Sequence, residues 1–236
     1  MSAYLFDPHP PVAVPIRGSQ QQFPVRRIFC VGRNYGAHAR EMGFSDREPP
    51  FFFTKPADAL VLDGAEIPYP MLTKNLHHEI ELVLAIDSEA KNLPAEAAMD
   101  VIFGVAVGID LTRRDLQMAA RDKGRPWDWG KSFDQSAPIG EIVPLQQLAE
   151  DARQLDKGRI WLDVNGTRRQ EADLAELIWN VPEIISAVSK AMHIIPGDLI
   201  YTGTPAGVGA IEPGDRVTGG IDGIGDLAVS IGARAE

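Results

Sequence analysis

Short runs of β-branched, aromatic and aliphatic residues, bounded by glycine, proline and other turn-forming residues, recur along most of this sequence. Runs of this length and composition predict strands, and they do not alternate regularly with helical segments. A doubly wound fold requires that alternation, so we expect an α+β fold that is dominated by β-sheet and has a few short helices. The predicted strands are RIFCVG, PFFFTK, HEIELVLAI, VIFGVAVGID, RIWLDVNG, DLIYTG, RVTGGI and LAVSIG.

Capping and stop residues predict a small number of helices between these strands. Asn34 is a suitable N-cap for a helix that ends at Met42, before Gly43. A second helix is expected to begin around Thr112 and Asp115, since both residue types favour helix N-termini. Two more helices are expected toward the C-terminal third. The four predicted helices span residues 34–42, 112–121, 173–180 and 181–191.

The first 24 residues are rich in proline and polar residues. Proline removes a backbone donor and fixes φ, so this segment predicts an extended arm that lies on a domain. We therefore expect an N-terminal proline-rich arm at residues 1–24 and one catalytic domain at residues 25–236. The turn-dense stretch PGDLIYTGTPAGVGAIEPGDRV near the C-terminus is typical of a β roll.

The charge of the chain excludes several classes of partner. Its 236 residues carry a formal net charge of −10, which is the wrong sign for binding nucleic acid or an anionic membrane. A small acidic substrate remains compatible, provided that basic residues inside the site capture it. The single cysteine, Cys30, lies in a strand-like apolar run and predicts a small core residue, and neither a signal peptide nor a membrane span is evident. These features predict a cytoplasmic protein.

Three acidic residues occur inside or directly after apolar strands. Alternate side chains share one face of a strand, so Glu79 and Glu81 project together, and Asp110 ends another apolar run. Three oxygen ligands without cysteine suit a hard divalent cation, magnesium first and manganese second. From the pattern alone, a solvated strand edge with Asp110 as a helix cap is an equally good interpretation.

The segment GRNYGAHAREMG contains a candidate acid–base pair. If it is helical, His38 and Glu41 lie three residues apart on one face, where the carboxylate can orient the imidazole. A surface hydrogen-bonded pair is the more common outcome of such spacing. Flanking glycines and the polar sequence that follows would allow this segment to move as a lid.

Basic and polar residues follow the acidic ones along the chain. The helix expected after Asp110 begins TRRDLQ, so one of its polar side chains can lean over a metal there, although surface charge is the alternative for the arginines. Lys131 lies among aromatic residues and is a candidate partner for an oxyanion; alternatively its stem covers a tryptophan. The turn YTGTPAGVG offers hydroxyls and backbone amides to a carboxylate. The spacing of its glycines, and of those in GRPWDWGKS, does not match nucleotide-binding loops.

Seven motifs in order resemble the fumarylacetoacetate hydrolase family, and its bacterial acylpyruvate hydrolases in particular. The resemblance covers residues 26–232 and implies a mixed β-sandwich roll that is usually dimeric. It also favours the metal interpretation of the acidic residues over the solvated edge. The motifs are GRNYGAHAREMG, FFFTKP, NLHHEIEL, GIDLTRRDLQ, PWDWGKSFDQSAP, DVNGTRRQ and YTGTPAGVG.

The resemblance assigns roles to individual positions of this chain. It implies that the magnesium or manganese ligands are Glu79, Glu81 and Asp110. It implies that the catalytic residues are the water-activating pair His38 and Glu41, with Lys131 and Gln117 over the substrate. It further implies that the substrate pocket is lined by Arg33, Tyr35, Lys55 and Thr204.

These roles predict metal-dependent hydrolysis of a carbon–carbon bond in a 2,4-dioxo acid. The substrate would chelate the cation, His38 would activate water, and Lys131 with Gln117 would meet the resulting oxyanion before pyruvate enolate leaves. The proline-rich arm leading into FPVRRIFCVGRNYGAHAREMG resembles that of the family's fumarylpyruvate hydrolases, which implies fumarylpyruvate as the substrate and fumarate and pyruvate as the products in gentisate breakdown. Alternatives on the same site are oxaloacetate decarboxylation and isomerisation of 2-hydroxyhepta-2,4-diene-1,7-dioate. A structural metal-binding scaffold without turnover also stays open.

Overall fold

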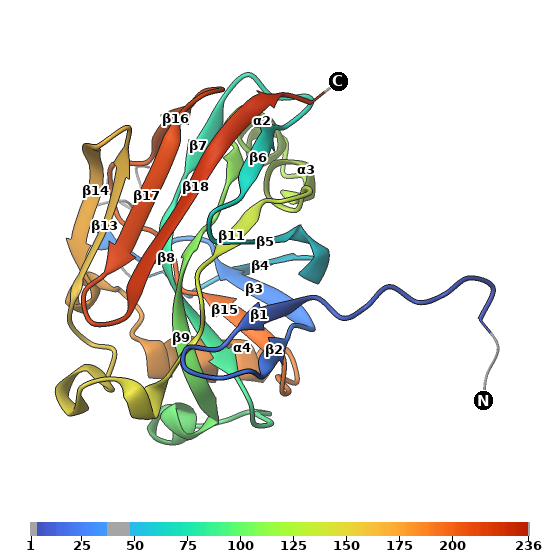
Figure 1. Cartoon of the computed structure of the whole chain (residues 1–236). Coiled ribbons are helices and arrows are strands. Elements are labelled where there is room, and N and C mark those ends of the chain that lie inside the picture. The colour runs from blue at the N-terminus through green and yellow to red at the C-terminus, as the bar shows by residue number, and fades with distance from the viewer. Residues whose placement is uncertain (1–3, 37–47, 236) are drawn as a thin grey trace.

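A mixed, eight-stranded β-sheet forms the centre of the protein. The computed structural model describes residues 4–36 and 48–235 (Figure 1). The strand order is β4-β3-β15-β8-β9-β11-β5, and β12 pairs with β9 beside β11. β3 and β15 are parallel, as are β11 and β5, whereas β8 and β9 form an antiparallel pair. These strands are β3 (Arg27–Val31), β4 (Phe52–Lys55), β5 (Leu60–Leu62), β8 (Ile80–Ile86), β9 (Ile102–Ile109), β11 (Ala137–Ile139), β12 (Val143–Pro144) and β15 (Asp198–Tyr201).

A second, five-stranded sheet has the order β14-β13-β17-β18-β6 and contacts β8 and β9 of the central sheet (Figure 1). A small sheet, β10-β7-β16, extends the fold beyond the start of β8. The expected mixed β-sandwich is therefore confirmed. The strands of these two sheets are β6 (Glu66–Tyr69), β7 (Leu76–His78), β10 (Thr112–Arg113), β13 (Arg159–Val164), β14 (Thr167–Asp173), β16 (Gly209–Ile211), β17 (Arg216–Ile221) and β18 (Gly225–Arg234).

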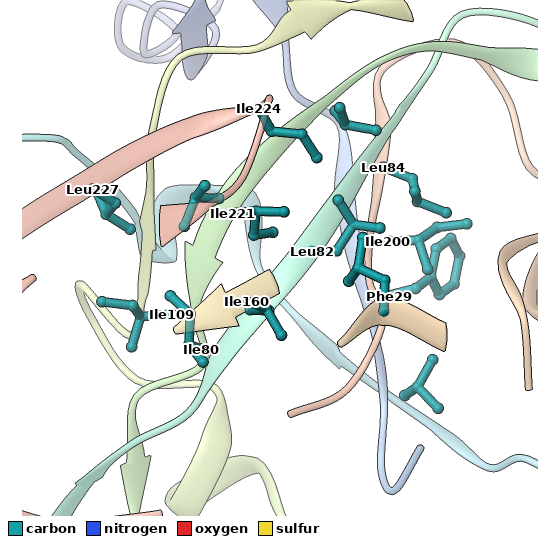
Figure 2. Close-up of a cluster of buried hydrophobic side chains, with 14 of the residues drawn as sticks. Phe29, Ile80, Leu82, Leu84, Ile109, Ile160, Ile200, Ile221, Ile224 and Leu227 are labelled. Atoms are coloured by element: carbon teal, nitrogen blue, oxygen red, sulfur yellow. The ribbon is translucent and has the colours of Figure 1, made fainter. Parts of the chain in front are cut away.

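Alternation along β8 divides the core into two parts. Ile80, Leu82 and Leu84 face the five-stranded sheet and pack against side chains such as Ile160 and Leu227 (Figure 2). The intervening Val83 and Ala85 face the other side, where a smaller cluster contains Cys30 and Tyr201. Cys30 is a free, fully buried thiol, as the sequence predicts, and its burial raises its pKa. A strand buried on both faces explains why this run is almost continuously hydrophobic.

The proline-rich N-terminal segment forms a hairpin of β1 (Ala13–Pro15) and β2 (Gln22–Pro24). Val14 and Phe23 are its buried residues, and both belong to the smaller core cluster. The Arg17 amide donates to the carbonyl of Ile142, which ties the hairpin to the domain. Residues before the hairpin extend away from the body of the molecule (Figure 1).

Helices cover a small part of the chain, and no helix among residues 4–36 and 48–235 is long and apolar enough to cross a membrane. The predicted helices at 112–121 and 181–191 correspond to α2, which begins at Arg114, and to α4. The helix α3 is not among the expected ones. The helices in the described part of the chain are α2 (Arg114–Asp122), α3 (Asp128–Lys131), α4 (Val181–Ala191) and the 3₁₀ segments η1 (Ala57–Ala59), η2 (Ala95–Val101), η3 (Leu145–Gln147), η4 (Glu150–Ala152) and η5 (Leu174–Glu176).

The helix predicted at 173–180 is wrong. Only one 3₁₀ turn forms there, closed by a capping box between Asp173 and Glu176. The residues after it donate their backbone amides to Asn34, so they cannot continue a helical ladder. A second capping box at Asn180 then starts α4.

Candidate metal and substrate site

The three carboxylates predicted as metal ligands meet at the start of β8. Glu79 lies between β7 and β8, Glu81 lies in β8, and Asp110 follows β9. The antiparallel register of β8 and β9 brings Asp110 next to Glu79, where the Asp110 amide donates to the Glu79 carbonyl at 2.8 Å. One carboxylate oxygen from each lies within 4.8 Å of the others, and the three residues are only 1 to 5% exposed.

Three basic side chains, also buried, surround these carboxylates. Lys131 Nζ donates to Glu79 Oε2 at 2.8 Å, to Asp110 Oδ2 at 2.6 Å and to Thr112 Oγ1 at 2.7 Å. Lys55 Nζ lies 2.9 Å from Asp110 Oδ1, and Arg114 Nη2 donates to Glu79 Oε1. Because the basic and acidic side chains are equal in number, their full formal charges balance in the absence of a cation. Such balance is what allows ionised groups to be buried at all.

Two members of this cluster, Glu81 and Lys131, have shifted pKa values. Burial, followed by the neighbouring charges of Asp110 and Glu79, raises the pKa of Glu81 well above its ordinary value. Among the described residues, Glu81 makes no ion pair, and its Oε2 accepts the Gly203 amide at 2.7 Å. Burial alone would lower the pKa of Lys131, but Asp110 and Glu79 outweigh it and hold that pKa above its ordinary value.

The donor set fits a hard divalent cation. Asp110 Oδ1 is buried and accepts no hydrogen bond from the described residues, although Lys55 Nζ is close by without hydrogen-bond geometry. An orphaned carboxylate oxygen of this kind has coordination capacity to spare. The cluster contains oxygen donors only, without cysteine or histidine, which favours magnesium or manganese over zinc. Glu79, Glu81 and Asp110 are the residues that would hold the ion.

The position of Lys131 depends on close packing between two helices. A Cβ on Gly130 would lie 2.8 Å from the Cα of Gln117, so the absence of a side chain allows α3 to approach α2. This approach brings Lys131 to the carboxylates and places Gln117 nearby, on the buried side of α2. Gln117 accepts a hydrogen bond from Arg114 Nη1. The predicted capping role of Thr112 is wrong: its hydroxyl accepts from Lys131, and α2 begins without a side-chain cap.

A glycine turn after β15 forms a second wall of the site. Gly203 has φ of +99°, a left-handed conformation, and an added Cβ would lie 2.7 Å from the Cβ of Asn34. Asn34 Nδ2 donates to the carbonyls of Thr202 and Trp179, so this side chain links the turn after β15 to the loop that precedes α4. The buried Thr204 follows, and its hydroxyl oxygen accepts from Gln170 Nε2 at 2.8 Å.

The remaining predicted site residues are placed as follows. His38 and Glu41, and the lid expected around them, lie outside the described residues. Lys55, predicted to line the substrate pocket, is 1% exposed and points at Asp110. Tyr35 is buried in the larger core cluster, where burial raises its pKa above the ordinary value. Arg33 stacks over the ring of Phe51, with 5.2 Å from Cζ to the ring centroid.

Sequence reasoning left two contributors to this region without a role. His78 Nδ1 pairs with Gln170 Oε1 at 2.9 Å, and both side chains are almost fully buried. Gln170 is the one buried residue of β14, an otherwise exposed or half-buried edge strand. A single polar residue among charged neighbours carries no local signal of burial, because the contact that buries it joins segments far apart in the sequence.

Comparison with known proteins identifies the relatives of this chain. The sequence model described as fumarylacetoacetate (FAA) hydrolase C-terminal matches residues 27–231. A fumarylpyruvate hydrolase from a Ralstonia species is 46% identical over 185 residues, which is 78% of this chain and 94% of that protein. A mitochondrial oxaloacetate tautomerase from Rattus norvegicus is 42% identical over 199 residues, which is 84% of this chain and 88% of that protein.

Solved structures agree with the sequence comparison. The crystal structure of fumarylpyruvate hydrolase from Pseudomonas aeruginosa, in complex with Mn²⁺ and pyruvate, has a TM-score of 0.94 and 52% identity. The match covers 98% of this chain and all of that chain. The matches in sequence and in structure span nearly the whole domain. This chain therefore belongs to the fumarylacetoacetate hydrolase family.

Proposed function

We propose that this protein is a metal-dependent hydrolase that cleaves a carbon–carbon bond in acylpyruvates. One observation carries the proposal: three buried carboxylates lie within 4.8 Å of one another inside a ring of buried basic side chains. The close relatives named fumarylpyruvate hydrolase, at 46% and 52% identity, support the same reaction. We infer fumarylpyruvate as the substrate, giving fumarate and pyruvate in an aromatic (gentisate) degradation route.

Glu79, Glu81 and Asp110 would hold Mg²⁺ or Mn²⁺, and Mn²⁺ is the ion in the related Pseudomonas aeruginosa structure. When bound, the cation supplies Lewis-acid stabilisation of the negative charge that develops on the pyruvate part. The formal charges of the three basic side chains, Lys55, Arg114 and Lys131, balance those of the three carboxylates. A bound divalent ion therefore leaves this region with a surplus of about two positive charges. A dianion such as fumarylpyruvate matches that surplus, which supports an acidic substrate in a chain of net charge −10.

The protein's own residues divide the remaining work. Arg114 holds Gln117 in place on α2, and Lys131 provides a buried positive charge beside the carboxylates. We propose that Gln117 and the positive charge of Lys131 stabilise an oxyanion at the carbonyl remote from the substrate carboxylate. His38 and Glu41 are proposed to activate water. The spacing of three residues between His38 and Glu41 in the sequence supports this role. Both residues lie outside the described part of the structure.

Oxaloacetate chemistry is the second candidate function. The relatives named oxaloacetate tautomerase share 39 to 42% identity with this chain, and oxaloacetate also offers a carboxylate beside a 2-oxo group. Decarboxylation and isomerisation need no water-activating pair. His38 and Glu41 therefore favour hydrolysis.

The test is a panel of fumarylpyruvate, fumarylacetoacetate, acetylpyruvate and oxaloacetate, assayed with Mg²⁺ and again after chelation. We expect the highest kcat/KM with fumarylpyruvate, loss of turnover on chelation and recovery on adding Mn²⁺. His38→Ala is expected to lower kcat about 100- to 10,000-fold with cation affinity unchanged. A preference for oxaloacetate over every acylpyruvate would contradict the proposal. Cation binding that stabilises the fold, without turnover of any substrate in the panel, would identify a structural metal scaffold instead.

We further propose that the protein is a cytoplasmic homodimer. Each protomer would consist of an N-terminal arm, residues 1–24, and a catalytic domain, residues 25–236. Tyr4, Leu5 and Phe6 are 72 to 97% exposed on the extended segment before the hairpin, which supports a contact with a second copy. Light scattering of the full chain and of a chain lacking residues 2–9 tests the dimer. A monomeric full chain would contradict it.

A further inference from the structure

The side-chain amide of Gln170 makes four hydrogen bonds, which is all that an amide can make. Its Oε1 accepts from His78 Nδ1 at 2.9 Å and from the Ile80 backbone amide at 3.1 Å. Its Nε2 donates to Thr204 Oγ1 at 2.8 Å and to the Pro205 carbonyl at 2.9 Å. A fully satisfied amide that is 1% exposed fixes the segments on both of its sides.

The backbone partners define which way this amide points. The Ile80 N–H can only donate, so it must face the oxygen, and the Pro205 carbonyl can only accept, so it must face the nitrogen. The same orientation then applies to the side-chain partners. His78 must donate through Nδ1, and the Thr204 hydroxyl oxygen must accept from Gln170.

This arrangement leaves the Thr204 hydroxyl proton available to a ligand. Its oxygen is occupied as an acceptor, and among residues 4–36 and 48–235 none accepts a hydrogen bond from this hydroxyl. Thr204 is 3% exposed, and the preceding residue, Gly203, donates its amide to Glu81 at the metal end of the site. A buried hydroxyl whose proton has no acceptor in the described part of the chain is suited to an anionic oxygen of the substrate.

Gln170 also acts on the other wall of the site. It binds the residues on both sides of Glu79, namely the His78 ring and the Ile80 amide. One side chain from the five-stranded sheet therefore joins the strand junction that carries a metal ligand to the turn that carries Thr204. The pyruvate end of a substrate would lie between the strand junction that carries Glu79 and the turn that carries Thr204.

We propose that Gln170 is a positioning residue that makes Thr204 a hydrogen-bond donor to the pyruvate end of the substrate; this rests on the proposed function. The role is indirect: Gln170 acts through Thr204. Removing the Gln170 amide should therefore weaken substrate binding and leave the rate of the chemical step nearly unchanged. Once Thr204 has lost its own hydroxyl, removing the amide should have little further effect.

A double-mutant cycle tests this coupling. Gln170→Met keeps the side-chain length without the amide, and Thr204→Val keeps the shape without the hydroxyl. We expect each single change to raise the KM for fumarylpyruvate about 5- to 10-fold, as for one lost hydrogen bond, with kcat altered less than about 3-fold. The double variant should have the KM of Thr204→Val alone, and Thr204→Ser should keep the wild-type KM. Glu171→Gln, an exposed neighbour on β14, is the matched control and should change nothing.

The same cycle is repeated by calorimetry with pyruvate as the probe in the presence of Mn²⁺, which needs no turnover. Absent acylpyruvate hydrolysis with the same pattern of Kd changes would overturn the proposed function and support the role of Gln170. Multiplicative effects in the double variant would overturn that role, as would a wild-type KM and Kd for Thr204→Val. Should Gln170→Met fail to fold, the Thr204 variants alone remain decisive on the donor, and Gln170→Glu replaces it in the cycle.

Discussion

Replacing Lys131 with methionine removes the positive charge that lies between two buried carboxylates. The Lys131 ammonium donates to Glu79, Asp110 and Thr112, and its side chain is 3% exposed. Methionine has a similar length and an apolar end, so the change tests the charge more than the packing. In the absence of a divalent cation, the carboxylates lose a counter-charge that solvent cannot replace.

The expected loss of stability follows from the contacts that remain. Removing one partner of a buried ion pair costs about 3 to 5 kcal/mol. Lys55 still lies 2.9 Å from Asp110, and Arg114 still binds Glu79, so we expect the lower end, about 3 kcal/mol. An unfolding entropy of about 2.1 cal/mol/K per residue gives roughly 0.5 kcal/mol/K for this chain, and hence a decrease in Tm of about 6 °C.

Calorimetric melting in chelator and then with excess Mg²⁺ measures the effect. A divalent ion at 100 times its Kd adds about 2.7 kcal/mol, so Mg²⁺ should raise the Tm of both proteins. It should raise the Tm of Lys131→Met more, since the ion there also neutralises the buried carboxylate charge that has lost its lysine partner. Lys123→Met, at the exposed C-terminal end of α2, is the control. An unchanged Tm in chelator, or an equal response to Mg²⁺, would refute the account of Lys131 as the counter-charge.

Three other predictions concern single residues of the site. Glu79→Gln should weaken Mn²⁺ binding at least about tenfold by titration calorimetry, and wild-type affinity would remove Glu79 from the ligand set. Burial, and then Arg114, lowers the pKa of His77 from 6.5 to about 4. The folded protein should therefore lose stability as pH falls from 6.5 to 4, by about 1 to 2 kcal/mol after discounting partial exposure. Urea unfolding should show a flatter pH profile for His77→Gln, and an identical profile would count against this. Gly130→Ala should lower the free energy of unfolding by about 1 to 3 kcal/mol, because its Cβ meets Gln117; a wild-type unfolding curve would contradict that packing.

The sequence predicted the central sheet and the acidic cluster for the same reason. A strand alternates its side chains strictly, so Ile80 and Leu82 on one face require Glu79 and Glu81 to lie on the other. The pattern alone left a solvated edge equally possible, and the family resemblance favoured a buried metal site for this acidic pair. Asp110 joins the pair because β8 and β9 are antiparallel neighbours, a pairing that two long apolar runs in succession favour.

The ring of basic residues was only partly predictable. Lys131 and Arg114 follow the acidic residues closely in sequence, whereas Lys55 reaches Asp110 from β4, on the far edge of the central sheet. The failed helix at 173–180 has the same origin. The predicted start at residue 173 coincides with a capping box in the structure, but the backbone amides of residues 178 and 179 bind Asn34, more than a hundred residues earlier. Local signals identify where an element can start, and long-range hydrogen bonds decide whether it continues.

The balance of buried charge explains how one site can be both preformed and dependent on a cation. Three carboxylates without counter-charge would not stay buried, so the basic ring allows the pocket to assemble before any ion arrives. The same balance means that a divalent ion adds surplus positive charge in a region from which water is largely excluded, where charge interactions are strong. An anionic substrate removes that surplus. Cation and substrate therefore stabilise each other in the site, and the acidic surface of the chain opposes only the approach of the substrate.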